Sequence, residues 1–198
     1  MGEDVFYSHS RSSLLPLWGS SEGIGIEASD YETRSFLEKQ GYHELDKTVS
    51  MVADLSDTHR TVTSNANLVP VPSRWIMVGG SLDDDTDDFL PPPAPCESLV
   101  YPGEGIVAGK IVTYSMSELD PKRAAITDFW VHQPHRGKGI GSILLDAALS
   151  RLLEKGFEKV ELVTDPSKNP VAYDMYRRRE FRVVAEWCSY QKKLESRI

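Results

Sequence analysis

The stretch Arg136-Gly137-Lys138-Gly139-Ile140-Gly141-Ser142 decides how this chain folds, because it sets three glycines between a predicted strand and a predicted helix. Residues 125–131 before it are mostly apolar and β-prone, and residues 143–155 after it repeat apolar side chains at helical spacing. Glycine lets the backbone approach a ligand without a Cβ in the way, and the N–H groups at a helix start bind anions. The stretch therefore predicts a site for an anion, most simply a phosphate.

Composition and charge narrow the class of protein. The chain has 198 residues, 40% hydrophobic and 26% charged, as expected of a globular domain that buries a core. Its formal net charge of -8 argues against non-specific nucleic-acid binding, so we expect no nucleic-acid partner. Apolar runs are too short for a membrane span and Met1-Gly2-Glu3-Asp4 is unlike a signal peptide, so we expect no membrane association. Cys96 and Cys188 are too few and too far apart for a disulfide framework or a metal site, so we expect a cytoplasmic location.

Turn and periodicity signals on either side of the glycine stretch predict a mixed sheet with helices packed on it. The predicted strands are residues 98–101, 106–116, 124–131, 159–164 and 181–192, and a second helix starts at Pro170. The resulting order β-β-β-α-β-α-β indicates an α/β (α+β) protein with a mixed, mostly antiparallel sheet.

Residues 1–57 contain a helix and a strand that repeat a later part of the chain. Asp30 is typical of a helix N-cap, and residues 48–55 of a strand. Shifting the sequence by 139 positions superposes three anchors, namely Asp30 on Asn169, Tyr42 on Phe181 and Leu55 on Leu194. Three anchors at one spacing favour a degenerate duplication over chance, and only the second copy has a glycine stretch.

Residues 58–97 separate this half-copy from the region with the glycines. They combine several prolines with the acidic run 83–88, which lacks the ligand spacing and central glycine of a calcium loop. We expect an irregular, acidic and Pro-rich connection that contains one short strand near Trp75. Three parts are thus predicted: 1–57, 58–97 and 98–198.

The region from about residue 98 to residue 194 resembles the GNAT N-acetyltransferase superfamily. The glycine stretch looks like its R/Q-x-x-G-x-G/A acyl-CoA signature, and Asn169, Ala172, Tyr176 and Phe181 have the spacing of its second motif. Residues 14–55 resemble the C-terminal half of another copy, as in tandem GNAT proteins. The resemblance implies a GNAT acyl-CoA N-acyltransferase fold, acetyl-CoA as acyl donor, no metal, and a small-molecule or peptide amine as acceptor.

The resemblance also assigns coenzyme contacts. Backbone N–H groups of the glycine stretch would hold the CoA pyrophosphate, and the end of the strand before it would pair with the pantetheine arm. The implied contacts are Phe129, Trp130, Val131, Arg136, Gly137, Lys138, Gly139, Ile140, Gly141, Ser142, Asn169 and Tyr173. Core packing is an additional role for Phe129 and Val131, solvent exposure is the alternative for Lys138, and Asn169 is first of all a helix cap.

Tyr176 and Asp128 are the candidate catalytic residues that the resemblance implies. A thiol has a pKa of about 8.5 and a phenol of about 10, so the Tyr176 phenol is protonated at neutral pH and can donate to the departing thiolate. Core packing is its alternative role. Asp128 could bind the amine or take its proton, or else form a surface ion pair. His132 and His135 are the other candidate bases, and as a metal pair they lack further ligands.

Two departures from the family pattern leave alternatives open. Glu180 stands where the second motif has glycine, so Arg177-Arg178-Arg179 would neutralise the helix end instead. Residues 58–97 do not resemble the helices that form the family's substrate walls, so the half-copy would fill that space within the chain or by exchange with a partner chain in a homodimer. We therefore predict direct acetyl transfer in a ternary complex. The alternatives are an inactive CoA-binding or structural relic and, from the glycines alone, a dinucleotide-binding module.

Overall fold

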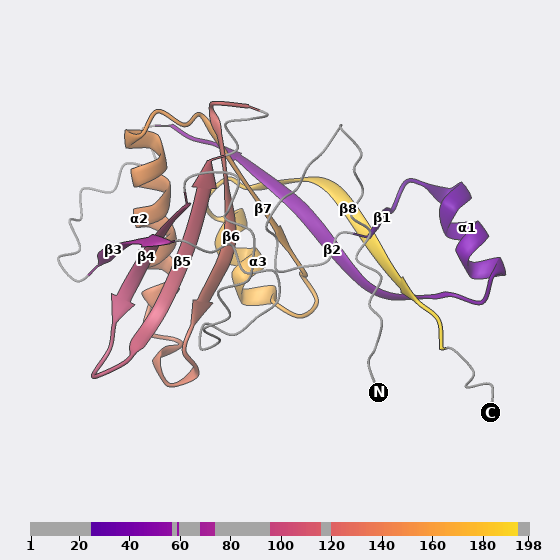
Figure 1. The fold of residues 1–198 in the computed structure, drawn as a ribbon, viewed down its shortest axis with the longest axis horizontal. Helices are drawn as coiled ribbons and strands as arrows, with labels where there is room; N and C mark the ends of the chain where they lie inside the picture. Colours follow the sequence, from indigo (N-terminus) through magenta and orange to yellow (C-terminus); the bar gives the residue numbers. More distant parts are fainter. Residues whose placement is uncertain (1–24, 57–58, 60–67, 74–95, 116–119, 194–198) are drawn as a thin grey trace.

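One sheet of eight strands organises the protein (Figure 1). The computed structural model describes residues 25–56, 59, 68–73, 96–115 and 120–193. In chain order the elements are β1 (Ile26–Glu27), α1 (Tyr31–Lys39), β2 (His43–Asp54), β3 (Val69–Ser73), β4 (Cys96–Pro102), β5 (Val107–Ser115), β6 (Arg123–Val131), the short 3-10 helix η2 (Gln133–His135), α2 (Ile140–Glu154), β7 (Lys159–Thr164), α3 (Pro170–Arg177) and β8 (Arg182–Gln191). The predicted class, a mixed and mostly antiparallel sheet with flanking helices, is confirmed.

The strand order is β1-β8-β2-β7-β6-β5-β4-β3. The neighbouring strands β6 and β7 pair over only part of their length. Every neighbouring pair is antiparallel except β6 and β7, which run parallel and pair only from Arg123↔Lys159 to Ala125↔Glu161. β6 stays paired with β5 as far as Val131, opposite Gly109. The edge of β6 that faces β7 therefore has no partner in β7 after Ala125.

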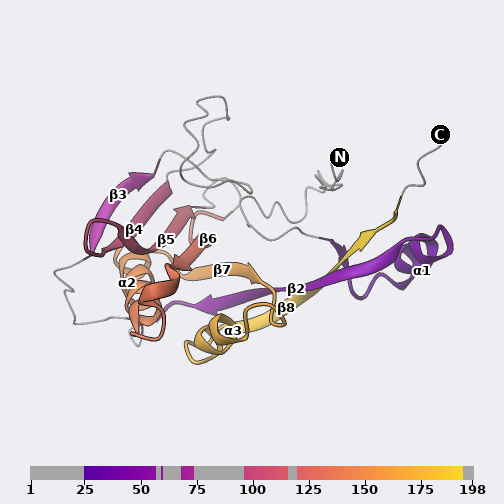
Figure 2. The ribbon, with the colours of Figure 1, turned by 90° about the horizontal axis from the view of Figure 1, so that it is seen from below.

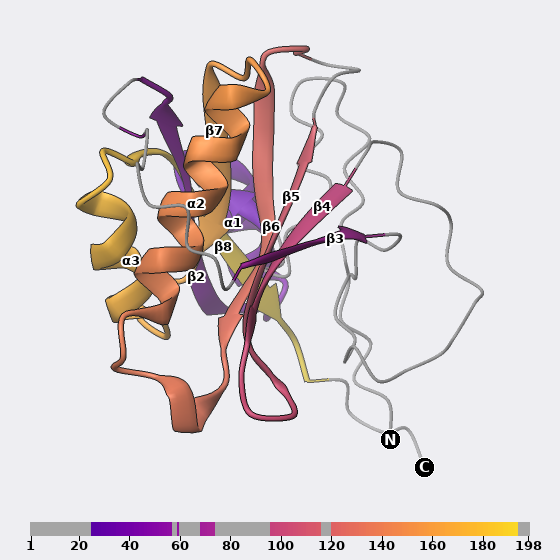
Figure 3. The same ribbon diagram turned by 90° about the vertical axis from the view of Figure 1, so that its left-hand side faces the viewer.

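Helices α2 and α3 cover the same face of the sheet (Figures 2 and 3). The buried stripe of α2 follows the predicted spacing and consists of Ile140, Leu144, Leu145, Ala148, Leu149 and Leu152. It packs on β4, β5 and β6. Gly109 of β5 permits a close approach, since an added Cβ there would lie 3.0 Å from Leu144 Cδ1. In the described part of the chain, no helix combines the length and the apolar character that crossing a bilayer requires.

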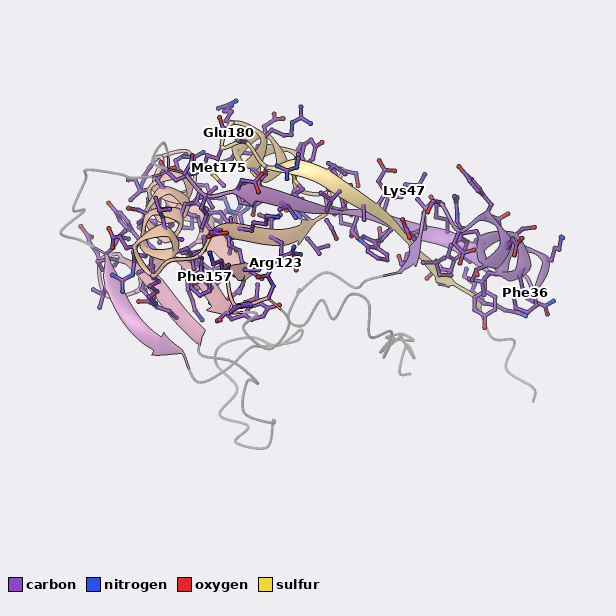
Figure 4. The ribbon with its side chains drawn as sticks, turned by 90° about the horizontal axis from the view of Figure 1, so that it is seen from above. Phe36, Lys47, Arg123, Phe157, Met175 and Glu180 are labelled. Carbon is purple, nitrogen blue, oxygen red and sulfur yellow. The ribbon has the colours of Figure 1, made fainter. Side chains whose placement is uncertain are left out.

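Strand β2 comes from the N-terminal part of the chain yet lies inside the sheet, between β8 and β7. Residues 26–54 thus share one sheet with residues 96–191, and the predicted division at residue 57 stays a prediction. Helix α1 lies at the far end of β2 from α2 and α3 (Figure 1) and has no buried residue. Phe36 in α1 is 60% exposed and remote from Met175 and Glu180 at α3 (Figure 4). This helix therefore lies away from α2 and α3, and the expected role of the half-copy as a substrate wall stays a prediction.

Local signals located most element boundaries. Asp30 caps α1 by accepting the Thr33 N–H at 3.0 Å, as its residue type predicted. Helix α2 begins at Ile140, three residues before the predicted start, and β2 begins at His43 rather than at residue 48. The predicted strand near Trp75 lies outside the described residues.

Part of the predicted irregular connection 58–97 is a strand. Residues 69–73 form β3, which pairs with β4 at the edge of the sheet. Pro70 and Pro72 lack N–H groups, and an edge strand tolerates this because one side of it has no partner strand. The prolines favoured an irregular connection in the sequence, whereas the position of the segment at the edge of the sheet depends on the tertiary structure.

Candidate active site

The glycine stretch forms the turn that leads from η2 into α2. Gly137 and Gly139 have φ of 75° and 78°, and an added Cβ on either would meet no described atom within 4 Å beyond the adjacent residues. The left-handed backbone favours glycine, and the space above it is open. The Ile143 N–H donates to Gly139 O at 3.0 Å, so the N–H groups of residues 140–142 precede the first intrahelical bond. The turn therefore has the geometry of an anion site at a helix N-terminus.

One of the two basic side chains of this turn is bonded to the strand before it. Arg136 Nε donates to Val131 O at 2.9 Å, which ties the guanidinium to the end of β6. Lys138 is exposed, in line with its predicted solvent position. The rings of His132 and His135 lie 6.2 Å apart. Within the described residues, no cluster of three or more His, Cys, Asp or Glu could hold a metal ion.

The end of β6 meets the start of α2 and helix α3 around Gly141. A Cβ added to Gly141 would lie 3.7 Å from Phe129 Cζ, Val131 Cγ2 and Met175 Sδ, which is ordinary contact. Phe129 and Val131 pack against the helix-side core, as expected from their apolar character. Trp130 lies on the other face of the strand by alternation. The edge of β6 that has no partner among the described strands after Ala125 thus lies next to the glycine turn.

Asp128 follows a β-bulge in β6 and faces away from the helices. The register shifts between Val112 and Thr113 of β5, which leaves Thr127 unmatched. Asp128 Oδ2 lies 3.9 Å from the Nζ of Lys110, a buried lysine of β5. Burial raises the pKa of Asp128, and the Lys110 ammonium and a hydrogen bond from Trp130 act in the opposite direction. Asp128 is therefore ion-paired, as in the surface-ion-pair alternative, but its carboxylate is half-buried rather than exposed.

Lys110 is a site residue that the sequence analysis missed. It is the only charged residue of β5, in a run whose other members read as a buried strand. A buried ammonium needs a partner, because removing a charge from water is costly. The single lysine in this apolar strand could therefore have indicated a buried ion pair from the sequence. Its carboxylate partner could be named only from the register of β5 and β6.

Tyr176 is packed into the core at the junction of α3 with β6. It is 6% exposed, and its ring centroid lies 6.3 Å from that of Phe129 and 5.7 Å from that of Phe181. The packing role named as its alternative is therefore real. Its contact with Phe129 also places Tyr176 beside the end of β6, where residues 129–131 are the predicted coenzyme contacts. Tyr173, one turn earlier, is half-buried.

The start of α3 corrects one prediction. Asn169 occupies the N-cap position, but its side chain makes no capping hydrogen bond. Asp165 organises the turn instead: its Oδ1 accepts the N–H groups of Ser167 at 2.8 Å and Lys168 at 3.0 Å. Burial tends to raise the pKa of Asp165, but these hydrogen bonds hold it below its usual value. Asn169 was favoured because it directly precedes the helix, whereas the carboxylate upstream bonds the turn more strongly.

The end of α3 agrees with the predicted departure from the family motif. Glu180 has φ of 63°, the left-handed conformation that glycine adopts most easily. Arg179 Nη1 donates to Met175 O at 3.1 Å, so an arginine does neutralise this helix end. Arg177 and Arg178 are exposed.

Among the described strands the one parallel pair separates beside a glycine-rich helix start, as the resemblance to the GNAT superfamily implies. The dinucleotide-binding alternative is wrong, because that module needs a mostly parallel sheet and β6 pairs antiparallel with β5. A model of the acetyltransferase (GNAT) family matches residues 73–181. The chain belongs to the GNAT acetyltransferase family.

Curated relatives are mycothiol acetyltransferases. The chain is 28% identical over 171 residues to the enzyme of Clavibacter sepedonicus, an alignment that covers 86% of this chain and 54% of that protein. It is 38% identical over 60 residues to the enzyme of Corynebacterium aurimucosum, covering 30% of this chain and 19% of that protein. The chain thus spans about half the length of the first of these relatives.

Solved structures share the fold at low identity. A GCN5-related N-acetyltransferase from Sphaerobacter thermophilus superposes with a TM-score of 0.57 at 18% identity, covering 83% of this chain and 57% of that one. A tandem GNAT protein from the clavulanic acid biosynthesis pathway gives a TM-score of 0.55 at 18% identity, covering 84% of this chain and 61% of that one. At such identity these neighbours establish the fold and no specific activity.

Proposed function

We propose that this protein transfers an acetyl group from acetyl-CoA to a primary amine by direct transfer in a ternary complex. The observation that carries the proposal is the adjacency of two backbone features. The glycine turn at the start of α2 presents N–H groups and an open surface, and the unpaired edge of β6 runs up to it. A ligand with a diphosphate joined to an amide-containing arm fits this arrangement, because the diphosphate can bind the N–H groups of the turn while the arm pairs with the strand edge.

Acetyl-CoA would supply the acetyl group and a thiolate leaving group. The N–H groups of residues 137–142 would bind the diphosphate, with Arg136 adding positive charge near the end of β6. Backbone groups of residues 129–131 would pair with the pantetheine arm while Phe129 and Val131 keep their side chains in the core. These roles rest on the open Cβ directions at Gly137 and Gly139 and on the free strand edge.

Tyr176 would protonate the thiolate, and Asp128 would hold or deprotonate the amine. The buried phenol beside Phe129 lies at the strand end where the arm would terminate, which supports the donor role. Asp128 stands on the opposite face of β6, paired with Lys110, so donor and acceptor would approach from the two sides of the strand. The raised pKa of Asp128 makes the carboxylate a stronger base than an exposed aspartate.

The decisive experiment measures coenzyme binding and turnover separately. Calorimetry with acetyl-CoA tests binding, and a thiol reagent then follows CoA release with a panel of primary amines that carry no free thiol, such as amino sugars. We expect Tyr176→Phe to lower kcat by a factor of about 10² or more, as removal of a general acid does, with acetyl-CoA affinity unchanged within about twofold. Tyr190→Phe is the control, because the Tyr190 phenol accepts a hydrogen bond from Arg34 of α1 outside the proposed site, and we expect it to retain turnover.

The same measurements distinguish the alternatives. Binding without thiol release for any amine would favour an inactive CoA-binding relic. Unchanged turnover in Tyr176→Phe would remove the acid role. A monomer in analytical ultracentrifugation that releases thiol would show that no partner chain is needed, whereas the homodimer stays a prediction.

A further inference from the structure

Arg179 connects the two helices that flank the proposed coenzyme site. Its guanidinium makes a two-pronged ion pair with Asp146 of α2, in which Nη2 lies 2.9 Å from Oδ2 and Nε contacts Oδ1. Its Nη1 donates to Met175 O of α3 at 3.1 Å, and Nη2 lies 3.5 Å from Ser142 O in the first turn of α2. One planar group thus contacts the glycine turn and the end of α3 simultaneously.

The contacts of Arg179 surround the residues that the proposed reaction uses. Ser142 closes the glycine turn, and Met175 directly precedes Tyr176. Met175 Sδ also lies 3.7 Å from the Cβ position of Gly141, so α3 touches the turn beside the ion pair. The Arg179 N–H donates to Tyr176 O at 2.9 Å, which joins the backbone of Arg179 to that of Tyr176.

We propose that Arg179 is a positioning residue that fixes the spacing between the diphosphate-binding N–H groups of α2 and Tyr176 of α3; this rests on the proposed function. A guanidinium suits the task because its rigid fork matches a carboxylate with two bonds and keeps further N–H groups for carbonyl oxygens. A lysine at this position could contact only some of these carboxylate and carbonyl oxygens, because its ammonium is a compact group. The side chain is mostly buried, with 16% exposed, so water competes little for its bonds.

The arginine run supplies its own controls. Arg177 and Arg178 carry the same charge on the same helix end, but both are exposed. A general electrostatic effect on the helix terminus would be shared by all three residues. A positioning effect belongs to Arg179 and to its partner Asp146 alone.

The test compares acetyl-CoA dissociation constants of the intact protein at a temperature where circular dichroism shows every variant fully folded. We expect Arg179→Met and Asp146→Asn each to raise the dissociation constant by roughly tenfold, the order of one lost charge-assisted bond, and Arg179→Lys by less. The double variant should be no worse than either single one, because the same contact is removed. Arg177→Met and Arg178→Met should stay within about twofold of the wild type.

Two other results are distinguishable. If folded Arg179→Met binds acetyl-CoA as the wild type does and differs only in melting temperature, Arg179 serves stability and the positioning role is overturned. If the wild type itself does not bind acetyl-CoA, the proposed function fails and takes this inference with it. With an amine that the wild type acetylates, a positioning role further requires KM for acetyl-CoA to rise more than the loss of folded protein explains.

Discussion

Replacing Glu180 by glycine should stabilise the protein, because the residue adopts a backbone conformation that only glycine adopts without strain. Glu180 has φ of 63° and an exposed side chain. The left-handed conformation costs a residue with a Cβ about 1–2 kcal/mol, which glycine avoids. Glycine also has more conformational freedom in the unfolded chain, and this lowers the gain in stability by about 0.5–1 kcal/mol. The net gain of Glu180→Gly is therefore about 1 kcal/mol, a rise in melting temperature of roughly 2–4 °C for a domain of this size.

Thermal and urea unfolding followed by circular dichroism would measure this gain. Glu180→Ala removes the same carboxylate but keeps a Cβ, so it should leave stability nearly unchanged. Arg178→Gly is the second control, since Arg178 has φ of -65° and glycine there should cost about 1 kcal/mol. Equal stabilisation by Glu180→Ala and Glu180→Gly would refute the backbone explanation and assign the effect to the lost charge.

Two further predictions concern the site. Gly139→Ala should cost about 1–2 kcal/mol of stability and weaken acetyl-CoA binding, because φ at Gly139 is 78°. The Cβ added by Gly141→Ala meets only ordinary contacts at 3.7 Å, so this variant should preserve binding. Unfolding measurements and calorimetry compare the two variants. Asp128 must be deprotonated to act as a base, so activity should fall as pH drops through its raised pKa, and Lys110→Met should move this acid limb to higher pH because the ammonium favours the carboxylate. A pH–rate profile that is identical in Lys110→Met would contradict the base role of Asp128.

Features that depend on neighbouring residues in the chain were predictable. The stripe of α2 and the bounds of β7 follow from local periodicity, and the glycine turn from three glycines before a helix. Contacts between distant elements were not, because they need the strand register and helix packing. The Lys110–Asp128 pair spans two strands, and the Arg179–Asp146 pair spans two helices. The place of β2 between β7 and β8 is likewise a tertiary property that strand order in the chain does not give.

The pairing of β2 with β8 supports the sequence repeat, which stays a prediction. Thr48 pairs with Trp187, and these two residues are also equivalent under the shift of 139 positions. Lys47 pairs with Cys188, and Val49 with Glu186, so each pair maps onto the other when the copies are exchanged. A local two-fold axis through the Thr48–Trp187 pair therefore relates α1–β2 to α3–β8, as two copies of one helix-strand unit would require.

Equivalent units need not have equivalent surroundings, and the two predicted copies differ in what packs against them. The second copy buries Tyr176 and Phe181 against the core beneath α2 and β6. Their equivalents under the shift, Leu37 and Tyr42, are only half-buried, since no described element packs over α1 as α2 does beside α3. Both copies form the helix and the strand that their local patterns predict. Among the described residues, a buried phenol lies next to the glycine turn in the predicted second copy alone, where α2 packs against the unit.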